Sequence, residues 1–150
     1  MRALYDVNVL LDVLRDRQPH ADASTSALDL ATVGAVQGYL CASGVDTLAY
    51  LLRKGSGRDG VMRNLITLRR ILRIAEVTES VIDSALRLGW TDLEDAIVHE
   101  SAHLCGVQAI VTRDGNDFAR SAIPVYTPAT FVQTMAGEKI FDRARHLVRF

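Results

Sequence analysis

The stretch RALYDVNVLL, residues 2–11, contains two hydrophobic patterns that meet at one acidic residue. Residues 2–5 form a short apolar run, which is typical of a buried strand. Beyond Asp6, apolar side chains recur at helical spacing, at Val7, Leu10, Leu11 and Leu14. The stretch therefore predicts a strand, an acidic turn and a helix, with Asp6 at the carboxyl end of the strand.

Strand and helix patterns alternate along the rest of the chain. Gly55 to Gly60 predicts a flexible loop, and Thr91 has the spacing of an N-cap in a capping box with Glu94. Further strands are expected at Tyr39–Ala42, Ile71–Val77, Val107–Val111 and Val125–Tyr126, and helices at about 19–36, 45–54, 61–70, 78–89 and 91–104. This order predicts a three-layer α/β/α fold with a central, mostly parallel sheet.

The composition is that of a globular domain, with 150 residues of which 49% are hydrophobic and 23% charged. No apolar run approaches the roughly 18 residues of a membrane span, and Asp6 precedes any stretch long enough for the core of a secretory signal. We therefore expect a cytoplasmic protein with no membrane association, in which Cys41 and Cys105 are reduced thiols. The net charge of −1 is uninformative about nucleic acid, because a basic groove and an acidic site cancel in the sum.

Acidic residues follow three of the predicted strands, at Asp6, Asp46 and Asp114. Asp92 and Asp95 begin the helix before the fourth strand, and their spacing of three residues places them on the same side of that helix. Glu94 is expected to point elsewhere, and capping alone is a sufficient explanation for Asp92 and Glu94. In a parallel sheet the strand ends meet at one edge, where ligands bind.

Such a cluster of acids predicts a divalent cation. Two like charges about 4 Å apart repel by about 4 kcal/mol at an effective dielectric constant of about 20, and a bound cation would offset this cost. Oxygen ligands without a histidine or cysteine cage favour Mg²⁺ or Mn²⁺, which serve phosphoryl chemistry.

Three motifs in the chain resemble those of PIN domains: LYDVNVLL at residues 4–11, DLEDAI at residues 92–97 and IVTRDGNDF at residues 110–118. Residues 123–128 are similar to the closing strand of that family, so the resemblance covers about residues 1–135. It implies a single PIN-like nuclease domain over residues 1–150, with a helical tail from about residue 136. It also implies a Mg²⁺- or Mn²⁺-dependent endoribonuclease, similar to the homodimeric VapC toxins that a small antitoxin protein inhibits.

The resemblance also implies roles for individual residues. Asp6, Asp95 and Asp114 would bind the metal, with Asn8 holding Asp6 in place and Asp92 as a supporting residue. The second acid of the family is usually a glutamate, and the candidate here is the shorter Asp46. Some relatives use a later acid in the last motif, so Asp117 is an alternative to Asp114.

Other functions fit parts of the sequence. The segment His99-Glu100-Ser101-Ala102-His103 matches the HExxH pattern of zinc proteases, although Ala109 stands where a third histidine would be expected. Asp6-Val7-Asn8-Val9 is loosely similar to the DxD motif of aspartate-nucleophile phosphatases, with Asn8 in place of the second acid. A catalytically inactive PIN-like binding module is a further alternative.

Overall fold

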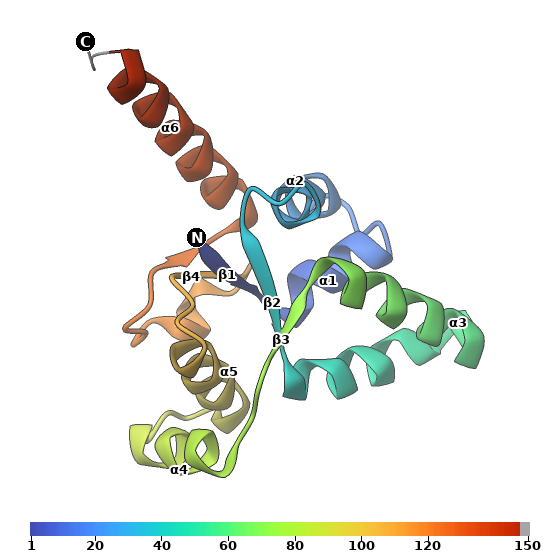
Figure 1. Ribbon diagram of the computed structural model, residues 1–150. Helices are drawn as coiled ribbons and strands as arrows, with labels where there is room; N and C mark the ends of the chain where they lie inside the picture. Colours follow the sequence, from blue (N-terminus) through green and yellow to red (C-terminus); the bar gives the residue numbers. More distant parts are fainter. Residues whose placement is uncertain (148–150) are drawn as a thin grey trace.

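The central sheet has five parallel strands in the order β3-β2-β1-β4-β5 (Figure 1). This architecture is seen in a computed structural model that describes the backbone of residues 1–147. The strands are β1 (Arg2–Tyr5), β2 (Gln37–Cys41), β3 (Arg73–Ala75), β4 (Ala109–Val111) and β5 (Val125–Tyr126). The strand expected over residues 71–77 is thus shorter, because α3 continues to Ile71.

Helices cover both faces of the sheet: α1 (Val7–Leu14), α2 (Ala21–Thr32), α3 (Ala42–Ile71), α4 (Glu79–Leu88), α5 (Leu93–Leu104) and α6 (Pro128–Leu147). The hydrophobic core on one face joins α1, α2, α3 and α6, and the core on the other face is built on α5, with α4 packed against α5. The predicted three-layer α/β/α fold with a parallel sheet is confirmed. No helix in residues 1–147 is both long and apolar enough to cross a membrane.

The last three residues of β1, Ala3 to Tyr5, are all apolar and buried, whereas Arg2 at its start is exposed. Tyr5 belongs to the core on the α1 face and Leu4 to the core on the α5 face. A strand covered by helices on both faces favours apolar residues at consecutive positions, because neither of its sides faces solvent. Burial of this strand places Asp6, which follows it directly, at the edge of the sheet.

The glycine-rich segment after Lys54 forms a sharp reversal inside α3. Lys54, Gly55 and Gly57 have non-helical backbone angles, and Gly55 and Gly57 have φ of 93° and 60°. The two helical halves of α3 fold back beside one another (Figure 1). The loop expected at 55–60 is therefore reduced to a kink, because helical geometry resumes within a few residues.

Residues 128–147 form one continuous helix, α6, which extends away from the sheet (Figure 1). The boundary expected near residue 135 falls inside this helix, and Phe131 and Met135 are buried in the core. The first part of α6 therefore belongs to the packed domain. Residues 148–150 of the expected tail lie outside the described residues.

Gly38 lies where the backbone of β2 approaches its neighbours most closely. A Cβ at this position would be 2.5 Å from Leu72 Cδ2 and 2.9 Å from Ala31 Cβ. We expect Gly38→Ala to lower the free energy of unfolding by about 1–3 kcal/mol, because added volume forces a packed core apart. Urea unfolding would measure it. Gly137→Ala is the control, because a Cβ added there would meet no described atom within 4 Å beyond its own stretch of helix, and alanine favours a helix. Equal stability of the two variants would contradict the prediction.

Candidate active site

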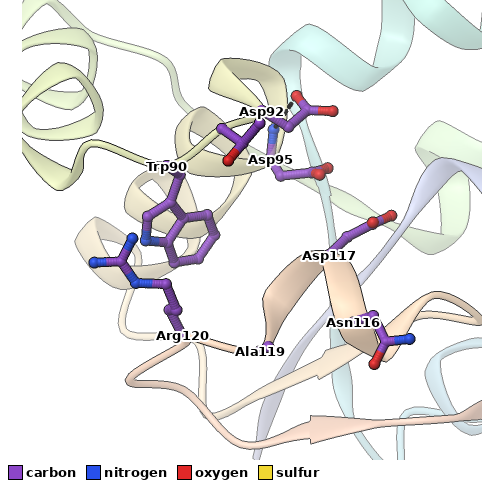
Figure 2. Close-up of a pocket in the computed structure, with 8 residues that line it drawn as sticks. Trp90, Asp92, Asp95, Asn116, Asp117, Ala119 and Arg120 are labelled. Carbon is purple, nitrogen blue, oxygen red and sulfur yellow. Dashed lines mark hydrogen bonds between the residues drawn. The ribbon is translucent and has the colours of Figure 1, made fainter.

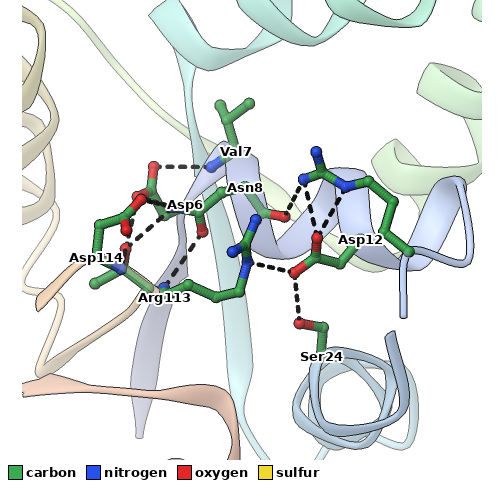
Figure 3. A network of polar contacts seen from close by, with 9 residues as sticks. Asp6, Val7, Asn8, Asp12, Ser24, Arg113 and Asp114 are labelled. Carbon is green, nitrogen blue, oxygen red and sulfur yellow. Dashed lines mark hydrogen bonds and ion pairs between the residues drawn. The ribbon is translucent and has the colours of Figure 1, made fainter. Parts of the chain in front are cut away.

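Asp6 and Asp114 lie at the carboxyl ends of the neighbouring strands β1 and β4 (Figure 3). Asp6 is the N-cap of α1, and its carboxylate accepts a hydrogen bond of 2.8 Å from the backbone N–H of Val7. The buried hydroxyl of Thr112 donates to Asp6 Oδ2 at 2.8 Å and accepts from the backbone N–H of Asp114 at 3.1 Å. Thr112, which the sequence analysis did not single out, thus connects the two acids.

Asn8 holds the same two acids from the first turn of α1. Its side-chain amide donates to Asp6 Oδ2 at 3.3 Å and to Asp114 Oδ2 at 3.0 Å, and its oxygen accepts from the backbone N–H of Arg113 at 3.4 Å. The asparagine therefore orients the carboxylates of Asp6 and Asp114 without adding charge. Asn8 thus donates through its amide nitrogen and accepts through its amide oxygen, whereas an ionised aspartate at this position could only accept.

Asp95 approaches the site from the first turn of α5. The N-cap of this helix is Asp92, whose carboxylate accepts from the backbone N–H of Asp95 at 3.2 Å. The predicted cap at Thr91 is therefore wrong by one residue, since the aspartate lies where its carboxylate reaches the free N–H groups of the helix. Figure 2 shows Asp95 and Asp117 approaching each other from α5 and from the short 3-10 helix η1 (Gly115–Phe118).

Burial and neighbouring acids raise the pKa of two of these residues, Asp6 and Asp95. The pKa of Asp95 is raised to about 7, first by burial and then by repulsion from Asp92, Asp117, Asp6 and Glu94. The pKa of Asp6 is raised by burial and by the charges of Asp114 and Asp117, against the opposing effect of hydrogen bonds from Thr112 and Val7. These residues, which come from three separate segments, therefore share one region of negative potential.

The structure separates Asp46 from this group. Asp46 is exposed on α3 and lines neither of the cavities formed by the other acids. Glu94, expected to point elsewhere, instead lines a small cavity together with Asp6 and Asp95 and accepts from Thr47 Oγ1 at 3.2 Å. The expectation for Glu94 was wrong because residue spacing along α5 does not show that Thr47, at the start of α3, lies beside Glu94 and binds its carboxylate.

The donor set fits a divalent cation. All of its potential ligands are oxygens, and burial and then neighbouring acids raise the pKa of Asp6 and Asp95, with no cationic side chain among the causes. Within the described part of the chain, no group of three or more acid, histidine or cysteine side chains is arranged so that it could hold a metal ion.

A buried ion-pair network supports the segment that carries Asp114. Asp12 on α1 is 0% exposed, and its carboxylate lies 2.6 Å from Arg113 Nε, 2.9 Å from Arg17 and 3.2 Å from Ser24 Oγ (Figure 3). Arg113 immediately precedes Asp114 in the chain, so its ion pair with Asp12, which is not aligned as a hydrogen bond, links the end of β4 to α1. An aspartate among the buried leucines of a helix was the sequence signal for this network, and it was missed.

The two histidines of the HExxH segment have different environments. His99 is 4% exposed, and its Nε2 accepts a hydrogen bond of 3.2 Å from the backbone N–H of Ala122. His103, one turn further along α5, is exposed. Because the Nε2 lone pair of His99 already binds a backbone N–H, the structure favours a packing role for this histidine over zinc ligation.

Fold and site together define an α/β protein with an acid cluster at the carboxyl edge of a parallel sheet. A family model for the PIN domain matches residues 2–116, so the chain belongs to the PIN domain family. A comparison with curated protein sequences finds no match.

Solved structures of toxin–antitoxin proteins have the same fold. VapBC2 from Rickettsia felis, bound to a DNA fragment from its promoter, is 17% identical, with 85% of this chain and 98% of that chain covered at a TM-score of 0.65. A toxin–antitoxin complex from Klebsiella pneumoniae is 25% identical, with 84% and 97% covered at 0.65. VapC20 of Mycobacterium tuberculosis, a toxin that cleaves the sarcin-ricin loop, is 14% identical, with 79% and 94% covered at 0.64.

Proposed function

We propose that this protein is an endoribonuclease that hydrolyses RNA phosphodiesters with Mg²⁺ or Mn²⁺, as the toxin of a toxin–antitoxin pair. The observation that carries the proposal is the convergence of Asp6, Asp95 and Asp114 at one edge of the sheet, where burial and then neighbouring acids raise the pKa of Asp6 and Asp95. The similarity to toxin–antitoxin complexes, and to a toxin that cleaves the sarcin-ricin loop, supports the choice of RNA as substrate.

Asp6, Asp95 and Asp114 would hold the cation. When bound, it would supply a water of lowered pKa and neutralise charge on the phosphate. Asn8 and Thr112 keep the carboxylates of Asp6 and Asp114 oriented, and Asp92 fixes the first turn of α5 that carries Asp95. Side chains held in place in this way lose little freedom when a ligand binds.

Two choices among the acidic residues concern which of them bind the metal. We favour Asp114 over Asp117 as a metal ligand, because Asn8 binds Asp114 and Asp6 together. Asp117 contributes its negative charge to both Asp95 and Asp6. We assign the fourth acid to Glu94 in place of Asp46, since Glu94 shares a cavity with Asp6 and Asp95.

The proposed partners are RNA, a small antitoxin protein and a second copy of the chain, all in the cytoplasm. Helix α3 exposes Tyr50, Met62 and Ile66, at 70%, 51% and 52% of their surface. Exposed apolar side chains of this size are suited to a protein partner. Size measurements on the chain alone, and with the product of a neighbouring reading frame, would test both protein partners.

Cleavage of single-stranded RNA is expected to require added Mg²⁺ or Mn²⁺ and to stop in excess chelator. The products are expected to carry 5′-phosphates and 3′-hydroxyls, because water would attack the phosphorus while the bond to the 3′-oxygen breaks. Attack by the RNA 2′-hydroxyl would instead give a 2′,3′-cyclic phosphate and a 5′-hydroxyl. A metal titration with end-group analysis of the fragments measures both. Undiminished cleavage in chelator would overturn the metal mechanism, and RNA binding without cleavage at any metal concentration would favour an inactive binding module.

The metal-free protein is expected to lose stability at Asp95 as the pH rises. The pKa of Asp95 is about 7 in the folded protein against a usual value of 3.8, so the folded state holds the proton more tightly than the unfolded state. The resulting stabilisation is complete below about pH 4 and is lost as the pH passes about 7. Melting temperatures of the parent and of Asp95→Asn between pH 4 and 8 test this, since the variant has no titratable group at position 95. If the melting temperatures of both proteins changed with pH at the same slope, the prediction would be contradicted.

A further inference from the structure

A cavity of about 310 Å³ opens beside Asp95, between the start of α5 and the short helix η1 (Figure 2). Its lining combines an indole ring, three carboxylates, an amide and a guanidinium, contributed by the turn before α5, by the start of α5 and by η1 with the residues after it. These side chains belong to Trp90, Asp92, Asp95, Asn116, Asp117 and Arg120. Asp95 is therefore shared between this cavity and the acid cluster.

Trp90 is held in place as a wall of the cavity. Its ring packs on His99, with centroids 5.0 Å apart and an interplanar angle of 49°, and meets Phe118 nearly edge-on at 6.2 Å. His99 in turn accepts the hydrogen bond from Ala122, which fixes the segment that follows Arg120. The indole thus has aromatic support from the protein and also faces the cavity.

The chemistry of the lining selects the kind of group that fits. Three carboxylates at the rim would repel a phosphate, so the cavity suits an uncharged, flat group with polar edges. Indole rings stack on nucleobases of any sequence, and carboxylate, amide and guanidinium groups hydrogen-bond to base edges. Arg120 is exposed, and within the described part of the chain no carboxylate forms an ion pair with it, so its donors are available to a ligand.

We propose that this cavity binds the nucleobase of an RNA nucleotide next to the cleaved phosphodiester, with Trp90 as the stacking surface and Arg120 as a contact to the base edge. The position beside the cleaved bond rests on the proposed nuclease function, because it follows from the sharing of Asp95 by both sites. The RNA backbone would pass the acid cluster while the adjoining base enters the cavity.

The first test uses the one tryptophan of the chain, Trp90, whose intrinsic fluorescence reports on the cavity alone. Titration of the Mg²⁺-containing protein with adenosine, guanosine, cytidine and uridine is expected to give saturable quenching with at least one nucleoside. Ribose 5-phosphate, which has no base, is expected to give none. Arg120→Ala is expected to weaken the quenching, whereas Arg58→Ala, exposed near the α3 kink, serves as the unchanged control. Absence of saturable quenching with all four nucleosides would overturn the proposal.

The second test places the base relative to the cleaved bond. Single abasic positions are introduced along a cleavable RNA, and removal of the base beside the cleaved bond is expected to lower kcat/KM by about tenfold or more, the scale of one lost stacking contact. Trp90→Leu should cause a similar loss of kcat/KM on the intact RNA, whereas Trp90→Phe should retain most of the activity. When Trp90→Leu acts on the RNA that lacks this base, kcat/KM should fall little further than with either change alone, because both changes remove the same stacking contact.

The outcomes separate this inference from the nuclease proposal. Cleavage by the parent protein that is insensitive to every abasic position, or multiplicative effects of Trp90→Leu and base removal, would overturn the base-binding role and leave the nuclease intact. Saturable nucleoside quenching in a protein that cleaves no RNA would contradict the nuclease and support the cavity. Thermal melting of Trp90→Leu, Trp90→Phe and Arg120→Ala checks that the compared variants are folded.

Discussion

Asp95→Asn is expected to lower RNA cleavage by more than about 100-fold while leaving the metal-free protein at least as stable as the parent. Loss of residues that only support a metal ligand already costs about 10–100-fold, so loss of the charge of a ligand should cost more. Asparagine has nearly the same shape as aspartate but cannot supply a negative charge. Cleavage rates at saturating Mg²⁺ measure the effect.

The stability of the same variant distinguishes an acid cluster from a helix-start residue. The pKa of Asp95 is raised by burial and by neighbouring acids, so removal of its charge at pH 8 should relieve repulsion and raise the melting temperature. A residue stabilised only by the dipole of α5 would instead lose about 0.3–1 kcal/mol. Asp83→Asn, at an exposed position of α4, is the control. A variant that melts earlier and cuts RNA at the parent rate would remove Asp95 from the site.

Asp12→Ala is expected to lower the free energy of unfolding by about 1–3 kcal/mol. The carboxylate is fully buried and accepts hydrogen bonds from Arg17 and Ser24, so its removal leaves these donors without their partner, while the partly exposed Arg17 and Arg113 remain accessible to water. Urea unfolding measures the change, with Asp29→Ala at an exposed position of α2 as the control. A change of less than about 1 kcal/mol would show that the network contributes little to stability.

The same substitution is also expected to reduce cleavage in the fraction that remains folded. The ion pair with Asp12 holds Arg113 at the end of β4, and Asp114 is the residue after Arg113. Loss of this ion pair should therefore leave Asp114, one ligand of the proposed site, less firmly positioned. Supporting residues of metal sites typically contribute about 10–100-fold. Measurement at low temperature and saturating Mg²⁺ separates this effect from unfolding; an unchanged kcat would limit Asp12 to a structural role.

The fold followed from the sequence because its signals are local. The apolar run of β1, the helical spacing after Asp6 and the left-handed Gly89 that ends α4 each depend on residues within one or two turns. The errors in secondary structure were also local in scale, such as Thr91 in place of Asp92 as the cap of α5. Local sterics and hydrogen bonding favour an element without setting its last residue.

For the candidate site, the sequence by itself determined which acids end strands or begin helices, and the PIN-like motifs named Asp6, Asn8, Asp95 and Asp114. Only the tertiary structure decided which side chains meet. It brought Glu94 to Thr47, joined Asp12 to Arg113 and left Asp46 exposed on α3. These contacts join residues far apart in the chain, so they depend on how whole helices pack against the sheet. A helical pattern specifies which face is buried, but the neighbours of that face are set only when the layers come together.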